Sequence, residues 1–266
     1  MSFDVTAEAY QRFMGRFSEP LAERFVAVIG LDGHERALDV GAGPGAVTGR
    51  LLARLDRGAV CAVDPSPSFV QAARQRFPAV DVRIGTAEHL PWPAATFDVA
   101  VAQLVVHFMS DPVAGLREMG RVTRPGGRVA ASVWDHAGGG SPLTTFWRAV
   151  RDLDPTAAGE SELPGAREGH LAELCTAAGL EAAESSSLRV SVAFSGFEDW
   201  WEPYTLGVGP AGAYVNRLDP AGQERLRAHC ADTLPSGPLE VPAAAWCVLA
   251  RVPSQTEPQL STSTSP

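Results

Sequence analysis

The sequence of 266 residues contains no lysine, because all 22 of its basic residues are arginine. This absence excludes a lysine-bearing phosphate loop, a Schiff-base lysine and a lysine general base. The net charge of −9 argues against nucleic acid as a substrate, since neutralising phosphates requires a basic face. There is also no run of about 18 apolar residues, so we expect no membrane-spanning segment.

Cysteine is scarce, and the four cysteines lie far apart, without the spacing of a metal or redox site: Cys61, Cys175, Cys230 and Cys247. The N-terminal stretch lacks the basic start and apolar core of a signal peptide. The hydrophobic fraction of 45% and the charged fraction of 20% are those of an ordinary globular protein. We therefore expect a reduced, cytoplasmic protein without a metal.

Glycine, by contrast, is concentrated in the stretch Arg36 to Val47, RALDVGAGPGAV. The apolar residues Ala37, Leu38 and Val40 near its start predict a short buried parallel strand. Gly41, Gly43 and Gly45 then allow a tight turn and a close approach of the backbone to a ligand. Residues 46–55 have the three-four spacing of a helix. A strand, a glycine turn and a helix together present backbone N–H groups to a bound small molecule.

This turn alone leaves two cofactors open. Gly41, Gly43 and Ala46 match the dinucleotide pattern G-x-G-x-x-G/A, whereas Gly41, Gly43 and Gly45 match the shorter G-x-G-x-G. Asp64 ends the second predicted strand, about 20 residues beyond the glycines, where a carboxylate accepts hydrogen bonds from a ribose diol.

Seven strand-like segments alternate with helices and predict an α/β protein with a largely parallel sheet. The later segments are expected at 80–84, 97–106, 128–134, 189–194 and 243–252. A helix-rich insertion separates the last two. The tail, residues 253–266, is polar and of low complexity, and we expect it to be disordered.

Four motifs in order, between Leu38 and Val133, make the chain resemble a class I S-adenosylmethionine-dependent methyltransferase. They are LDVGAGPG, VDPS, GTAEHLPWPAATFDVAVAQLVVHF and LREMGRVTRPGGRVAASVW. The resemblance is to the broad group that includes the ubiquinone/menaquinone-biosynthesis enzymes. It implies a Rossmann-like, doubly wound sheet of order 3-2-1-4-5-7-6 with the last strand antiparallel. It also implies an N-terminal helical lid at 1–35 and a methyltransferase domain at 36–252, with insertions at about 135–165 and 196–240 that form an acceptor cap.

The same resemblance implies which residues bind S-adenosylmethionine. The methionine part would lie along Gly41, Ala42 and Gly43, the ribose on Asp64 and the adenine face on Pro65. Ala87 and Gln103 would contact the cofactor through their backbone. Thr86 stands where the family often has an aspartate that accepts from the adenine amino group, and Glu88 would take over that hydrogen bond.

The segment before the glycine turn is predicted to be helical, with Pro20 opening a second helix. Tyr10, Phe13 and Arg16 could form a flap over the turn, or the aromatic pair could pack on the edge of the domain. Arg16 lies among apolar neighbours and needs an anion if buried. We expect it to bind the carboxylate of the cofactor, and we expect residues 10–17 to be mobile without ligand.

Catalytic residues are harder to identify, because displacement at a sulfonium needs mainly in-line positioning and exclusion of water. His107 and His136 follow the fourth and fifth strands and are candidate general bases, although each could equally be a packing or loop histidine. Aromatic residues of the insertions could cover the acceptor or form the core of the cap: Phe146, Trp147, Trp200, Trp201 and Tyr204.

Methyl transfer to a small molecule is the function that the sequence favours. A cofactor-binding, non-methylating protein of the same fold remains the alternative, and a NAD-dependent oxidoreductase is a weaker one. The sequence does not distinguish an oxygen, nitrogen, carbon or sulfur acceptor.

Overall fold

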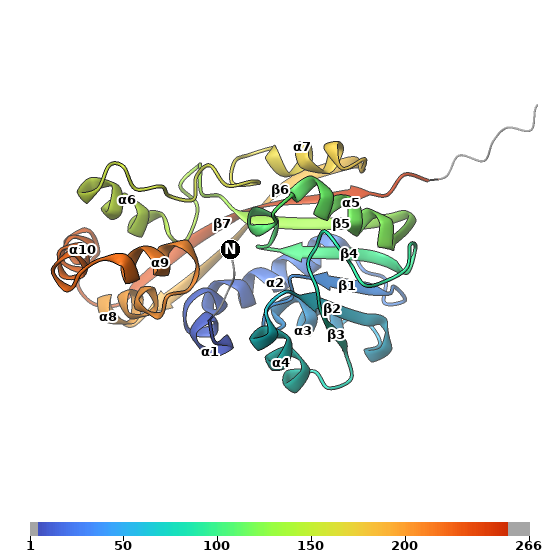
Figure 1. The fold of residues 1–266 in the computed structure, drawn as a ribbon, viewed down its shortest axis with the longest axis horizontal. Helices are drawn as coiled ribbons and strands as arrows, with labels where there is room; N and C mark the ends of the chain where they lie inside the picture. The colour runs from blue at the N-terminus through green and yellow to red at the C-terminus, as the bar shows by residue number, and fades with distance from the viewer. Residues whose placement is uncertain (1–4, 255–266) are drawn as a thin grey trace, which may run out of the picture.

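A computed structural model describes residues 5–254 as a seven-stranded sheet flanked by helices (Figure 1). The strands are β1 (Ala37–Val40), β2 (Val60–Asp64), β3 (Asp81–Ile84), β4 (Phe97–Gln103), β5 (Thr123–Trp134), β6 (Glu181–Phe194) and β7 (Leu239–Arg251). Their order is β3-β2-β1-β4-β5-β7-β6, and β7 is antiparallel to both of its neighbours. The predicted sheet order is therefore confirmed.

Three strands begin earlier than the sequence pattern indicates. β5 starts at Thr123, which pairs with Phe97 ahead of an irregularity in the ladder and lies well before the expected start at 128. β6 starts at Glu181 and β7 at Leu239. The additional residues of β6 are polar and mostly exposed on an edge strand, where apolar alternation gives no signal.

Helices cover both faces of the sheet. Side chains of α2 (Arg16–Ile29), α3 (Ala46–Leu52) and α4 (Pro67–Arg76) belong to one hydrophobic cluster with β1 and β2. Side chains of α5 (Pro112–Val122) and α7 (His170–Ala177) belong to a second cluster on the other face. This arrangement leaves the carboxyl ends of β1, β2 and β4 free to build a site.

A lobe that we call the cap, residues 135–165 and 196–240, lies beside the sheet in Figure 1, where β6 and β7 run into it. Its helices are α6 (Thr144–Leu153), α8 (Phe197–Trp201), η4 (Glu202–Leu206), α9 (Gly209–Arg217) and α10 (Pro220–Thr233). The helices α6 and α10 contact each other. The two predicted insertions thus lie together, and their role in covering the acceptor remains a prediction.

The N-terminal segment is a helix with a π-helical turn: α1 (Ala7–Tyr10), η1 (Gln11–Gly15) and then α2. Pro20 lies inside α2, so the prediction that it opens a helix was wrong. Proline removes one backbone hydrogen bond, and the buried Phe17, Leu21 and Phe25 keep the helix packed on the sheet.

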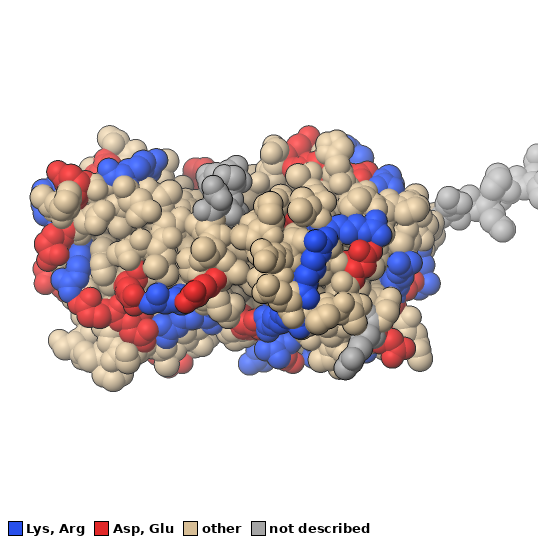
Figure 2. Space-filling model, turned by 60° about the horizontal axis from the view of Figure 1, so that its bottom comes forward, with Lys and Arg blue, Asp and Glu red and all other residues tan. Residues whose placement is uncertain are grey.

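Within residues 5–254, no helix is long and apolar enough to cross a membrane. Acidic and basic side chains are interspersed on the face shown in Figure 2. From residue 255 onward, the predicted disordered tail lies outside the described residues.

Candidate functional site

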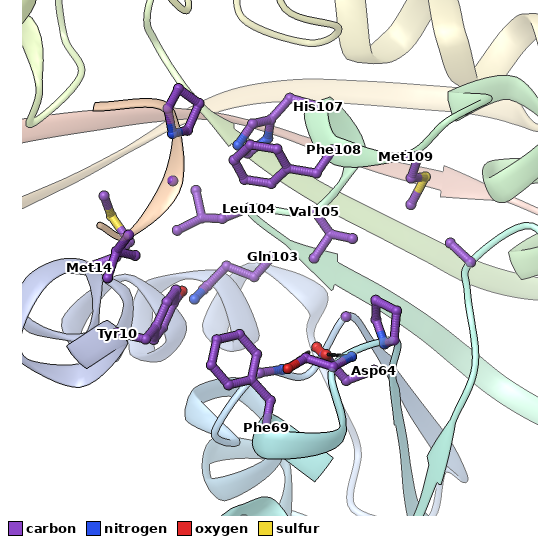
Figure 3. Close-up of a pocket in the computed structure, with 18 of the residues that line it drawn as sticks. Tyr10, Met14, Asp64, Phe69, Gln103, Leu104, Val105, His107, Phe108 and Met109 are labelled. Atoms are coloured by element: carbon purple, nitrogen blue, oxygen red, sulfur yellow. Dashed lines mark hydrogen bonds between the residues drawn. The ribbon is translucent and has the colours of Figure 1, made fainter. Parts of the chain in front are cut away.

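A cavity of about 750 Å³ opens at the carboxyl ends of β1, β2 and β4. Gly41, Gly43, Asp64 and Gln103 line it from the sheet, and its wall continues along the N-terminal segment, η3 (Val106–Phe108) and the cap. Figure 3 shows Tyr10, Phe69 and Asp64 at one end and His107 and Phe108 toward the other. Its size lies within the range of roughly 300–1,000 Å³ that is common for ligand sites.

The glycine turn forms the floor of this cavity. Gly41 has a φ of 68°, and a Cβ there would lie 2.4 Å from a methyl group of Val105, so the position requires glycine. Gly43 also has a positive φ, 55°, but no atom of the described residues lies within 4 Å of where its Cβ would be. Gly43 therefore faces open space in the cavity, and a ligand can approach its backbone closely.

Asp64 ends β2 and is only 6% exposed. Its carboxylate accepts hydrogen bonds from the backbone N–H groups of Gly43 and Ser66, each at 2.8 Å. Burial raises the pKa of Asp64, and these two hydrogen bonds oppose that rise. The same bonds fix the carboxylate against the glycine turn, where its remaining lone pairs can accept from a ligand.

The turn after β3 contributes Thr86, Ala87 and Glu88 to the cavity, beside Pro65. Glu88 Oε1 already accepts from the N–H groups of Ser110 and Asp111, at 2.8 and 3.3 Å. These bonds to Oε1 connect the turn to the start of α5. A ligand would therefore form its hydrogen bond with Oε2. The structure brings these four predicted residues together with Asp64.

A second hollow, of about 20 Å³, adjoins the glycine turn and is lined in part by Ser18, Asp39, Ala42 and Gln103. Gln103 Nε2 donates to the backbone oxygen of Ser18 at 3.0 Å, whereas Gln103 Oε1 and Ser18 Oγ are buried without a hydrogen-bond partner among residues 5–254. Asp39 accepts from the hydroxyl of Thr48 at 2.6 Å, and burial raises its pKa to about 7. Sequence reasoning missed Asp39, although an acidic residue inside a buried strand was the available signal.

Tyr10 lines the cavity as predicted, and its ring meets that of Phe69 edge-on at 5.3 Å. Arg16 is not among the lining residues. Its guanidinium pairs with Asp199 of the cap at 2.6 Å, donates to the backbone oxygen of Ala193 at 2.8 Å and lies 4.0 Å from the centre of the Phe194 ring. This corrects the expected contact with the cofactor carboxylate: Arg16 finds its anion in a distant part of the chain.

The two predicted histidines meet at the cavity, with ring centres 5.9 Å apart. Burial lowers the pKa of His107 well below its usual value and that of His136 to about 4. Both rings are therefore neutral near pH 7. His107 Nδ1 and His136 Nε2 have no hydrogen-bond partner among the described residues, so each can serve a ligand.

The cap aromatics do not line the cavity but form the core of the cap. Phe146 stacks on Tyr204 with ring centres 4.5 Å apart, and Trp200 lies 4.8 Å from Tyr204. The apolar wall consists instead of Phe13, Met14, Trp134, Leu143, Val208 and Ala211.

Glu160, which no sequence motif marks, also lines the cavity from the cap. It is 4% exposed, and its Oε2 accepts from the indole N–H of Trp147 at 2.6 Å. Burial raises the pKa of Glu160 to about 7.

Part of the chain is similar in sequence to known proteins. Residues 38–131 match the methyltransferase domain family. Residues 38–131 thus form a methyltransferase domain of the class I S-adenosylmethionine-dependent type. The malonyl-[acyl-carrier protein] O-methyltransferase of Serratia marcescens is 34% identical over 152 residues, which cover 55% of this chain and 58% of that protein.

A second relative of the chain is the 2-methyl-6-phytyl-1,4-hydroquinone methyltransferase 2 of Oryza sativa subsp. japonica. It is 36% identical over 114 residues, which cover 42% of this chain and 31% of the relative. Among solved structures, the [4+2]-cyclase SpnF matches with a TM-score of 0.52 at 24% identity, over 96% of this chain and 85% of that one, and it shows the fold alone. The chain thus spans little more than half of the first relative and a third of the second.

Proposed function

We propose that this methyltransferase transfers a methyl group from S-adenosylmethionine to a small-molecule acceptor bound in the same cavity. One observation carries the proposal: a single cavity joins the glycine turn and Asp64 to the two neutral histidines beneath the cap. A donor at one end and an acceptor at the other would be held in line for displacement.

The residues present fit the cofactor. Asp64 would accept from the ribose hydroxyls, and the open side of Gly43 lets the backbone approach the methionine part. Gln103 Oε1, which lies beside Asp39 and has no partner in the described part of the chain, would accept from the amino group. The carboxylate would lie on backbone N–H groups, since no arginine of the described residues lines the cavity.

The cofactor supplies an already activated methyl group when bound, so the protein has mainly to position the acceptor and exclude water. The apolar side chains of Met14, Trp134 and Leu143 line the cavity and would exclude water from its acceptor end. The neutral His107 and His136 can accept a hydrogen bond or a proton from the acceptor, which makes them the candidate general bases.

The acceptor class is open to several chemistries. The two relatives are named for an O-methylation of a malonyl group on a carrier protein and for methylation of a hydroquinone. We propose a small molecule for this chain because the acceptor end of the cavity is enclosed by buried apolar side chains such as Leu143, Val208 and Ala211.

Calorimetric titration with S-adenosylhomocysteine tests the cofactor site. The wild type should bind it, and Asp64→Ala should weaken binding by about 1–3 kcal/mol, the range for polar groups that lose a partner. Asp81→Ala, at an exposed position in β3 away from the cavity, is the matched control and should bind as the wild type does. Tight binding of NADH with none of S-adenosylhomocysteine would overturn the assignment.

Transfer of a labelled methyl group to an acceptor in a cell extract tests the reaction itself. Binding of the cofactor without any transfer would favour the alternative, a non-methylating protein of this fold.

A further inference from the structure

The cap end of the cavity combines an apolar wall with a buried carboxyl group. Glu160 lies in the link between α6 and α7 and lines the cavity with the buried side chains of Leu143, Val208 and Ala211. A carboxyl group in such surroundings is costly unless it has partners.

Glu160 has a partner for only one of its oxygens. The Trp147 indole donates to Oε2 at 2.6 Å, and the hydrogen bonds of residues 5–254 include none to Oε1. The Trp147 bond fixes the carboxyl group, because Trp147 itself packs edge-on against Phe146 at 5.2 Å and against Tyr214 at 6.0 Å. Glu160 lines the cavity, and Oε1 is thus the oxygen of its held carboxyl group that can still accept a hydrogen bond from a ligand.

The charges around the cavity have one sign. Its described lining includes Asp64, Glu88 and Glu160 but no arginine, and the chain has no lysine. At about pH 8, above the raised pKa of Glu160, this carboxyl group is ionised, and a ligand carboxylate or phosphate at the cap end would meet it without a cation to offset the repulsion. A ligand O–H or N–H would instead satisfy Oε1.

We propose that Glu160 determines acceptor specificity: it selects an acceptor with an apolar body and a hydrogen-bond donor, a hydroxyl or an amine, and rejects anionic acceptors. This inference rests on the proposed function, because it names the class of acceptor for the same cavity. Glu160 recognises the acceptor, and no proton transfer is assigned to it.

Four probes that share one apolar body test the idea: 4-pentylphenol, 4-pentylaniline, 4-pentylanisole and 4-pentylbenzoate. Their dissociation constants are measured by calorimetry at about pH 8, with and without saturating S-adenosylhomocysteine. The phenol or the aniline should bind the wild type about tenfold or more tightly than the anisole and the benzoate, as expected for a hydrogen bond to a charged group. Comparison of the phenol with the aniline then distinguishes the hydroxyl from the amine.

Glu160→Gln keeps the shape and the bond from Trp147, but it replaces the free oxygen with an N–H donor or an uncharged acceptor. It should weaken the donor probes about tenfold and remove the disadvantage of the benzoate, which a purely structural role would not do. Glu162→Gln, two residues away and exposed, should change neither ranking.

An unchanged ranking in Glu160→Gln, benzoate as the best ligand of the wild type, or no binding of either donor probe would overturn the proposal. Because the ranking is also measured without S-adenosylhomocysteine, it tests Glu160 even if the cofactor fails to bind. A failure of the cofactor titration would count against the proposed function, not against the acceptor class.

Discussion

Replacing Arg16 by alanine should loosen the contact between the N-terminal segment and the cap. The Arg16 guanidinium bonds to Asp199 at 2.6 Å and to the Ala193 backbone oxygen at 2.8 Å, and it lies over the Phe194 ring. Asp199 in turn accepts from the Ser195 N–H at 2.8 Å. Arg16→Ala removes all three contacts of the arginine and leaves Asp199 with the bonds from Ser195.

The expected loss follows from burial. The side chains of Arg16 and Asp199 are 27% and 35% exposed, so solvent screens the pair only in part. A hydrogen bond to a charged group contributes about 1.5–3 kcal/mol when buried, and exposed pairs contribute about 0–1 kcal/mol. We expect a decrease of about 1–2 kcal/mol in the free energy of unfolding, with the cation–π contact included.

Urea unfolding measures this loss, and Arg12→Ala is the matched control. Arg12 also joins the N-terminal segment to the cap, through Glu202, but those side chains are 47% and 58% exposed, so its loss should stay below about 0.5 kcal/mol. A double-mutant cycle of Arg16 with Asp199 should give a coupling of about 1 kcal/mol.

Two results would refute this reasoning. One is a loss for Arg16→Ala no larger than that for Arg12→Ala. The other is a coupling energy of zero between Arg16 and Asp199. The affinity of Arg16→Ala for S-adenosylhomocysteine separates this contact with the cap from the flap predicted from sequence. If Arg16 only joins the N-terminal segment to the cap, the substitution lowers stability. If Arg16 instead contacts the cofactor directly, the substitution lowers affinity without destabilising the protein.

The remaining predictions concern titration and the glycine turn. Burial raises the pKa of Glu160 from 4.5 to about 7, so the folded protein retains a proton that the unfolded chain loses, and stability falls as the pH rises through this interval. The free energy of unfolding, measured by urea titration between about pH 5 and pH 8, should fall less steeply with pH in Glu160→Gln, by up to about 1 kcal/mol per pH unit. Asp39 keeps a slope of the same sign in both proteins, and an equal slope in both would contradict the burial argument. Gly41→Ala should lower the melting temperature severely, because the new methyl group meets Val105 at 2.4 Å. Gly43→Ala should cost only the strain of a positive φ, about 1–2 kcal/mol, yet weaken binding of S-adenosylhomocysteine, and equal melting temperatures for the two variants would refute the distinction.

The sequence by itself predicted the seven strands and the proposed cofactor end of the site, whereas the order of the strands came from the resemblance to a family. Gly41 and Gly43 mark a turn that few other residues can make, and Asp64 follows an apolar strand at a characteristic distance. These features are local: they depend on backbone sterics and on strand periodicity, which a sequence displays directly. The carboxyl ends of parallel strands then bring such residues to one edge, as the structure confirms for Gly43 and Asp64.

Apart from the two histidines, the tertiary structure alone decided which residues surround the proposed acceptor end. Arg16 pairs with Asp199 across 183 residues, and the cap aromatics pack on one another instead of facing the cavity. Glu160 lies in an irregular link with no motif, yet it reaches the cavity wall because Trp147 holds it there. Which buried charge meets which partner depends on how distant segments pack together, and neither periodicity nor spacing along the chain carries that information.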